Sequence, residues 1–177
     1  GNAVMPGVYG AAIGGGGYFS SENQVNADFG TVAGGRDNRA GGDSSSVGGG
    51  LYNSSAGDAS TVGGGGFNFT TNSYATVSGG YVNFAGGWAA TVPGGGVNNA
   101  MGSASFAAGY HAKANHDGAF VWADFSGGDF ASTTSNQFLI RATGGVGIGK
   151  TNPATALDVN GTVTATSFSG ALASGVN

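Results

Sequence analysis

The chain has 177 residues, including 39 glycines and 19 aromatic residues (11 Phe, 6 Tyr and 2 Trp), but no cysteine, and its formal net charge is −4. The absence of cysteine excludes disulfides and thiolate chemistry, and with only five Lys and Arg residues we expect no nucleic-acid partner. Disorder is also disfavoured, because disordered chains combine few aromatics with high net charge, so this composition indicates a repetitive β architecture.

A 15-residue repeat runs through the first two thirds of the chain. A valine that is followed, after one residue, by a glycine pair recurs at Val32, Val47, Val62, Val77 and Val92. A hydroxyl residue precedes each of these valines, at Thr31, Ser46, Thr61, Thr76 and Thr91. An asparagine keeps the same period, at Asn23, Asn38, Asn53, Asn68, Asn83 and Asn98. So short and glycine-rich a unit does not suit a helical pair, and it predicts one turn of a parallel β-solenoid per repeat.

Each turn is expected to hold two short strands. One strand covers the Thr-Val pair. The other lies around the position before the asparagine, which is apolar in four successive turns and is expected to face the valines across a thin interior: Tyr52, Phe67, Val82 and Val97. The asparagines are expected at corners, with left-handed backbone and side chains bonded to the next turn. The glycine pairs are expected to supply positive φ and to leave room where chains approach each other.

The repeat is irregular at both ends. Ile13 is an earlier copy of the valine, displaced by a four-residue insertion near Tyr18 to Glu22. Phe106 and Phe120 are interpreted as continuing the series at a step of 14. A turn that buries about two sizeable side chains is too thin to offset the entropy of ordering 15 residues, so we expect identical chains to associate, with a homotrimer as the leading hypothesis.

The Val-x-Gly-Gly turns, the following Asn-x-Ala-x-Gly and the segment Ser105–Ala114 resemble the head repeats of trimeric autotransporter adhesins. The resemblance covers roughly residues 10–120 and implies a parallel β-roll that forms only as a trimer. This chain departs from the usual 14-residue unit, because a glycine stands where the family has a second large aliphatic residue: Gly34, Gly49, Gly64, Gly79 and Gly94. The roll is therefore expected to be thinner, or to have different corners.

From about Gly118 the repeat gives way to β-branched and aromatic runs broken by glycine, which read as short strands. Residues 118–177 resemble the neck that precedes the intramolecular chaperone of phage tail fibres and related bacterial surface proteins. We therefore divide the chain into head repeats (1–117) and a β-rich neck (118–177), cut from a longer protein. The predicted fold is all-β: a trimeric parallel β-roll of 15-residue turns, followed by a neck intertwined among three chains.

Residues Gly144–Thr151 match the phosphate-loop pattern G-x-x-x-x-G-K-[ST]. A phosphate loop needs its Lys and Thr to open a helix, whereas Pro153 follows at once and the next stretch is strand-like. We therefore predict a glycine-rich turn here. No paired carboxylates, Ser/His/Asp set or Cys/His set appears, so the sequence predicts no catalytic residue and no cofactor.

Two ladders on the repeat allow alternative functions. Asp28, Asp43 and Asp58 recur in phase and suggest a cation site, although a solvated edge is favoured because calcium needs six or more oxygens. His111 and His116 lack ligand-like neighbours, and no metal site is predicted. The hydroxyl ladder suggests ice binding, or simply good strand residues buried between chains.

An aromatic cluster gives the candidate contact site for a receptor or glycan: Phe69, Tyr74, Tyr81, Phe84 and Trp88. Exposed aromatic rings are platforms for sugars, and packing between chains is the alternative.

No apolar run is long enough to span a bilayer, so no membrane insertion is expected in this segment. The sequence thus predicts a non-enzymatic, extracellular trimer that works in adhesion or receptor binding on a bacterial surface or phage tail fibre. A structural spacer, or an ice- or glycan-binding solenoid, is the alternative.

Overall fold

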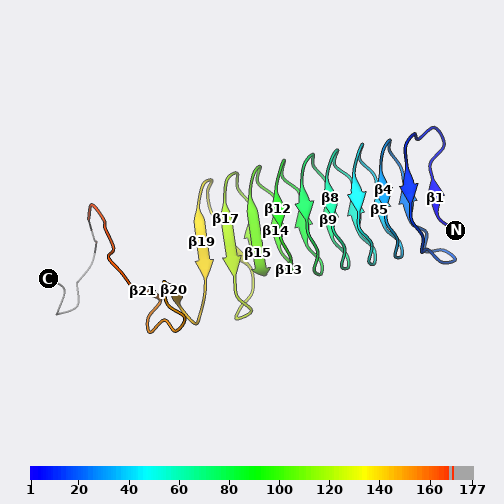
Figure 1. Ribbon diagram of the computed structural model, residues 1–177. Coiled ribbons are helices and arrows are strands. Elements are labelled where there is room, and N and C mark those ends of the chain that lie inside the picture. The colour runs from blue at the N-terminus through cyan, green and yellow to red at the C-terminus, as the bar shows by residue number, and fades with distance from the viewer. Residues whose placement is uncertain (168, 170–177) are drawn as a thin grey trace. The chain divides into compact units, whose positions relative to one another are not determined.

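In the computed structural model, residues 1–167 and 169 are described, and their regular structure is entirely β. The chain divides into two compact units, Gly1–Arg141 and Ala142–Asn177. The first is a parallel β-solenoid, of about ten turns (Figure 1). The prediction of an all-β solenoid is therefore confirmed.

The solenoid has two parallel sheets, and each regular turn contributes one strand to each sheet. The first sheet has the order β1 (Ala3–Val4), β3 (Gln24–Val25), β5 (Arg39–Ala40), β7 (Ser54–Ser55), β9 (Phe69–Thr70), β11 (Phe84–Ala85), β14 (Asn99–Ala100), β16 (Ala112–Ala114) and β18 (Phe130–Ala131). The second has the order β2 (Ala12–Ile13), β4 (Thr31–Val32), β6 (Ser46–Val47), β8 (Thr61–Val62), β10 (Thr76–Val77), β12 (Thr91–Val92), β15 (Phe106–Tyr110), β17 (Phe120–Ala123) and β19 (Phe138–Arg141), with β13 (Gly95–Gly96) also paired to β15.

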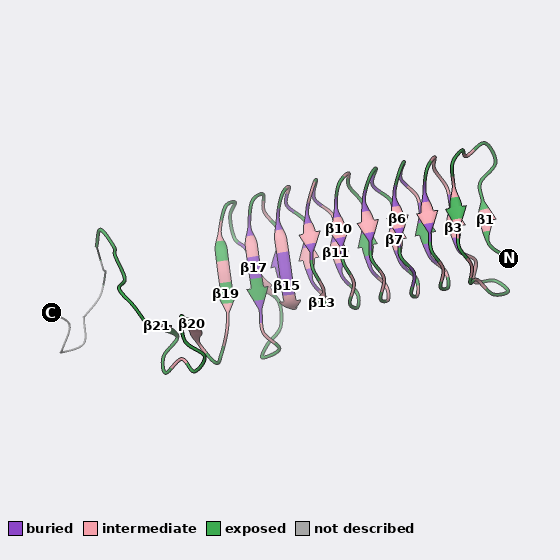
Figure 2. Ribbon diagram, in the orientation of Figure 1, coloured by how far each residue is buried: buried purple, intermediate pink, exposed green. Residues whose placement is uncertain are grey.

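The Thr-Val strands lie where the repeat predicts them. Thr76 pairs with Thr61 on one side and with Thr91 on the other, so the 15-residue period is the register of the sheet. Because side chains alternate along a strand, each valine points inward and each hydroxyl residue outward. Val62 is fully buried while Thr61 is half-buried. Figure 2 shows this alternation as buried and part-exposed segments along successive strands.

The second strand of each turn was placed wrongly by two or three residues. It follows the asparagine, as in β7 and β9, and its inward residue is small: Val25, Ala40, Ser55, Thr70, Ala85, Ala100 and Ala114. The residues before the asparagines, predicted to be interior, stand at left-handed corners instead. Tyr52 has φ +53° and is 44% exposed, and Val82 has φ +55° and is 38% exposed. A corner turns the side chain outward, so these residues cannot face the valines.

The asparagines form a buried ladder along the solenoid. The backbone N–H of Asn53 donates to the side-chain oxygen of Asn38 at 3.0 Å, and the same bond recurs one turn later from Asn68 to Asn53. The Asn53 amide also donates to the carbonyls of Gly49 and Gly65. The predicted bonding between turns is thus confirmed, whereas the positive φ belongs to the residue before the asparagine in the turns from Asn38 to Asn98.

The glycines allow neighbouring turns of the same chain to approach closely. Gly50 has φ +87°, and a Cβ there would collide with the carbonyl oxygen of Gly65 in the next turn. The same steric conflict would occur at Gly35, Gly65 and Gly80. The room that we predicted for a second chain is therefore taken, at these positions, by the next turn of the same chain.

Both irregular ends of the repeat are part of the solenoid. Ile13 pairs with Val32 as predicted, and the inserted residues contain an antiparallel bridge between Tyr18 and Ser21. Phe106, however, pairs with Thr91. The phenylalanines therefore continue the outward hydroxyl ladder, and the interpretation that they continue the valine series is wrong.

The parallel ladder goes on beyond the last 15-residue turn. Phe120 pairs with Phe106 and Phe138 pairs with Phe120, so a step of 14 residues is followed by one of 18. The compact solenoid unit ends at Arg141, whereas the sequence-based division was placed after residue 117. The second unit contains a parallel pair, β20 (Val146–Ile148) with β21 (Leu157–Val159). Residues 168 and 170–177, at the end of the predicted neck, lie outside the described residues.

Candidate functional site

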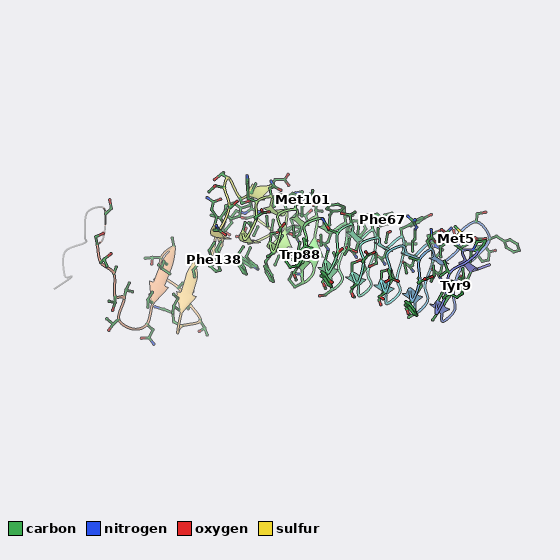
Figure 3. All side chains as sticks on the ribbon, turned by 90° about the horizontal axis from the view of Figure 1, so that it is seen from above. Met5, Tyr9, Phe67, Trp88, Met101 and Phe138 are labelled. Carbon is green, nitrogen blue, oxygen red and sulfur yellow. The ribbon has the colours of Figure 1, made fainter. Side chains whose placement is uncertain are left out.

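The solenoid has small side chains inside and large ones outside. Its interior holds valines, alanines, serines and the asparagine ladder. Large apolar side chains are exposed on the roll along its length, among them Tyr9, Trp88 and Phe138 (Figure 3). Since exposed aromatic surface is characteristic of interaction sites, the outside of the solenoid is where function is to be sought.

The five predicted contact residues are brought together only in pairs. Phe69 and Phe84 are adjacent rungs on the outer face of the first sheet. Tyr74 and Trp88 follow that sheet at a corner, with ring centroids 6.0 Å apart in an edge-to-face arrangement. Tyr81 stands at the other corner. Of the two pairs, Tyr74 and Trp88 offer the more open rings, 60% and 52% exposed.

Tyr81 belongs to a second group of rings, which we call the corner ridge: Tyr52, Phe67 and Tyr81. The rings of Tyr52 and Phe67 are stacked with centroids 5.2 Å apart, and Phe67 meets Tyr81 edge to face at 5.8 Å. The ring of Tyr81 also lies over Gly66, where a Cβ would stand 3.6 Å from it. The interior role predicted for Tyr52 and Phe67 is therefore replaced by a place on the surface.

A third group of apolar residues lies on the outer face of the second sheet, in its last three turns. We call it the apolar end: Phe106, Phe120, Trp122, Phe138 and Ile140. The three phenylalanine rings are stacked, with centroids 4.6 and 4.5 Å apart, and Phe138 is 68% exposed. In the preceding five turns, the position that aligns with these phenylalanines carries the half-buried Thr and Ser residues of the hydroxyl ladder.

A shallow apolar groove of about 470 Å³ adjoins the apolar end, lined by Gly96, Tyr110, Trp122, Phe125 and neighbouring residues. The rings of Tyr110 and Phe125 lie 4.4 Å apart at a tilt of 37°. The sequence interpretation missed both the groove and the apolar end. The alternation Phe120-Val121-Trp122-Ala123, with every second residue large, was the available signal for an exposed apolar strand face.

Polar groups beside the groove hold the loop of residues 124–129. Asp129 accepts a hydrogen bond from Nδ1 of His111 at 2.7 Å and lies 3.6 Å from the ammonium of Lys113. These partners, His111 first, hold the pKa of Asp129 below its usual value. Arg141 bonds to the Asp124 carboxylate at 3.2 Å and to the carbonyl of Gly128 at 2.7 Å. The contacts of Asp129 and Arg141 fix the loop. Outside it, His116 contacts the Ser132 hydroxyl at 2.8 Å.

The aspartate ladder bonds to backbone. Asp58 accepts from the backbone N–H of Asp43 at 3.1 Å, and Asp28 accepts from that of Tyr9 at 2.8 Å. Asp117 accepts in the same way from Ser103 at 2.7 Å. The carboxylates of Asp28, Asp58 and Asp117 thus each bond to the turn before them. Within residues 1–167 and 169 no group of three or more His, Cys, Asp or Glu side chains could hold a metal ion.

The phosphate-loop pattern falls on a strand and the turn after it. Val146–Ile148 is β20, paired with β21, and Lys150 forms an ion pair with Asp158 at 2.7 Å. The backbone N–H of Ala154, and then Lys150, lower the pKa of Asp158. A hollow in this unit is lined by residues 142–145 and 153–156, without Lys150 or Thr151. The geometry is therefore not the strand, loop and helix that bind phosphates.

The chain matches no known family and no curated protein at significant similarity. The resemblance to adhesin heads and tail-fibre necks therefore stays a prediction that rests on the sequence alone. Among the described residues there is no helix long and apolar enough to cross a membrane.

Proposed function

We propose that this chain is a segment of a non-enzymatic homotrimeric fibre that acts in adhesion or receptor binding, outside a bacterial cell or on a phage tail fibre. The observation that carries the proposal is the distribution of side chains in the solenoid: small residues fill the interior, while rings such as Tyr74, Tyr81 and Trp88 stand outside. Such a body offers a long, regular surface and little enclosed volume, which suits binding to another surface.

The homotrimer is proposed because the solenoid keeps so little apolar material inside. A regular turn buries one valine and a few small residues such as Ala75 and Ala85, while Phe138 is 68% exposed. Association of identical chains would bury exposed side chains such as Phe138, and burial of apolar surface is the main favourable term in association.

The ligand is proposed to be a glycan that stacks on the Tyr74–Trp88 pair, because an aromatic ring offers a sugar an apolar face. A panel of immobilised glycans tests this with the wild-type protein and the variants Tyr74→Ser and Trp88→Ser. We expect binding by the wild type and its loss in both variants, whereas Phe19→Ser, which changes an exposed ring in the inserted segment, should bind normally. A correctly folded trimer that bound no glycan of the panel would instead favour the spacer function.

Ice binding is a second candidate, favoured by one observation. The hydroxyl residues from Thr31 to Thr91 are all half-exposed and stand in register, one per turn, at the spacing of neighbouring strands. Thermal hysteresis of the purified protein, and its loss in Thr61→Leu, would support this function. It requires the face of the second sheet to be open to solvent.

A further inference from the structure

The outer face of the second sheet differs from every other surface of the solenoid. It offers two outward positions per turn, from Thr31 and Ala33 in the turn of β4 to Phe138 and Ile140 in β19, and none of these positions holds a charged residue. Five turns carry small side chains there, and the last three carry the apolar end. On this face Phe138, Trp122 and Ile140 are 68%, 36% and 38% exposed.

The other surfaces carry charge. The outer face of the first sheet has the exposed Arg39, and at its far end Lys113, over which the loop of residues 124–129 places Asp129. The corner between the sheets carries the aspartate ladder, with Asp43 and Asp58 exposed. Two copies of an acidic chain can therefore approach each other closely along the second-sheet face without bringing charges together.

We infer that the outer face of the second sheet is the surface on which copies of this chain associate, side by side, parallel and in register. The inference rests on the homotrimer of the proposed function and names the face that forms it. In a parallel arrangement each rung meets the same rung of its neighbours, so small residues meet small residues and phenylalanines meet phenylalanines. The partner that presents apolar residues at the repeat distance of this ladder is a second copy of the chain.

The exposed apolar area of the face is consistent with a second copy of the chain as the partner. The five side chains of the apolar end offer on the order of 400 Å² of exposed surface, if a full ring presents 150–250 Å². That is about half of the ~800 Å² that each partner contributes to a standard interface. The apolar end alone therefore falls short, and the flat, small-residue half of the face has to join the contact. Side-by-side packing along the whole sheet meets this requirement, whereas a partner held only at the end does not.

Single cysteines test the inference cleanly, because the native chain has none. Thr61→Cys places a thiol on the outer face of the second sheet, in β8. Ser54→Cys places one on the outer face of the first sheet, in β7, the preceding strand of the chain. Both native residues are half-buried and point outward. Each variant is treated with a short bis-maleimide and run on a denaturing gel, and its mass in solution is measured by light scattering before treatment. We expect both variants to have the wild-type trimer mass, with covalent cross-linking in Thr61→Cys alone.

A second pair of variants repeats the test by charge. Thr76→Lys, on the second-sheet face, should reduce the mass to that of one chain, a threefold loss, while Ser54→Lys should leave the mass unchanged. A trimer that cross-links through Ser54→Cys, through both positions equally, or through neither would overturn the inference and leave the homotrimer standing. A folded wild-type protein with the mass of one chain would overturn the homotrimer itself.

Discussion

One asparagine side chain per turn satisfies the backbone of two neighbouring turns. Asn98 is fully buried; its oxygen accepts from the backbone N–H of Ala112 at 2.9 Å, and its amide donates to the carbonyls of Gly94 and Gly109. Asn98→Ala should destabilise the fold by about 3 kcal/mol, because each buried group left without a partner costs roughly 1–3 kcal/mol. Chemical denaturation at fixed protein concentration measures this loss.

The next residue supplies the control for that experiment. Asn99 lies in β14 with its side chain on the outer face of the first sheet, half-buried. Asn99→Ala should change the free energy of unfolding by no more than about 0.5 kcal/mol, the usual range for surface positions. Equal losses in the two variants would mean that the ladder does not carry the bonding between turns.

The corners of the solenoid hold residues in strained, left-handed backbone. Val82 has φ +55° although its side chain is β-branched, and left-handed backbone is costly for such residues. Val82→Asn should therefore raise the melting temperature, by about 2–4 °C if the strain relieved is near 1 kcal/mol. Val82→Thr keeps the branched Cβ and should leave the melting temperature unchanged. A lower melting temperature for Val82→Asn would show that the Val82 side chain contributes more by packing than its conformation costs.

At this scale, periodicity identified the valine and asparagine ladders, because a buried position in a solenoid recurs with the length of the turn. It could not tell which way the residue before the asparagine points. Tyr52 and Val82 are apolar, and an apolar residue in phase with a ladder was taken as interior. Their direction is set by a positive φ that the sequence does not reveal, since both are residue types that rarely adopt it.

Among the elements, the loop of residues 124–129 depends most on a single side chain. Arg141 bonds to the Asp124 carboxylate and to the carbonyls of Asp124 and Gly128, and its guanidinium lies 5.3 Å from the centroid of the Phe130 ring. Arg141→Ala should free the loop without unfolding the turns before it. Limited proteolysis should then cut near Phe125, which is 79% exposed. Arg36→Ala, at an exposed position in a regular turn, should leave the wild-type digestion pattern, and indistinguishable patterns for both variants would contradict this role of Arg141.

The same loop explains why the sequence interpretation ended the repeat near residue 118, although the second sheet continues to β19. It lengthens one turn to 18 residues between Phe120 and Phe138, so the residues that continue the sheet no longer fall at the expected spacing. The outward position also changes from a hydroxyl residue to phenylalanine, so the sequence no longer shows which residues align with Thr91. A shift of one residue between adjacent strand positions exchanges inside for outside, which is how Phe106 came to be assigned to the valine series.

For the molecule as a whole, composition and repeat together were sufficient to predict an all-β solenoid, because few other folds suit a glycine-rich 15-residue period. The candidate site was predictable only in part. Tyr74 and Trp88 do meet, whereas the apolar end could be recognised only once the strand register had placed Phe106, Phe120 and Phe138 in one stack. Contacts between turns depend on register, and register in the irregular turns follows from loop lengths that the repeat does not encode.

We claim that this thin solenoid exists as a homotrimer, and the molar mass of the folded protein in solution decides whether it does. Size-exclusion chromatography with multi-angle light scattering, together with circular dichroism to show β structure, should give three times the 17.0 kDa of one chain. The melting temperature should rise with protein concentration, as expected where association and folding are coupled. A folded, β-rich sample with a mass near 17.0 kDa would contradict the claim.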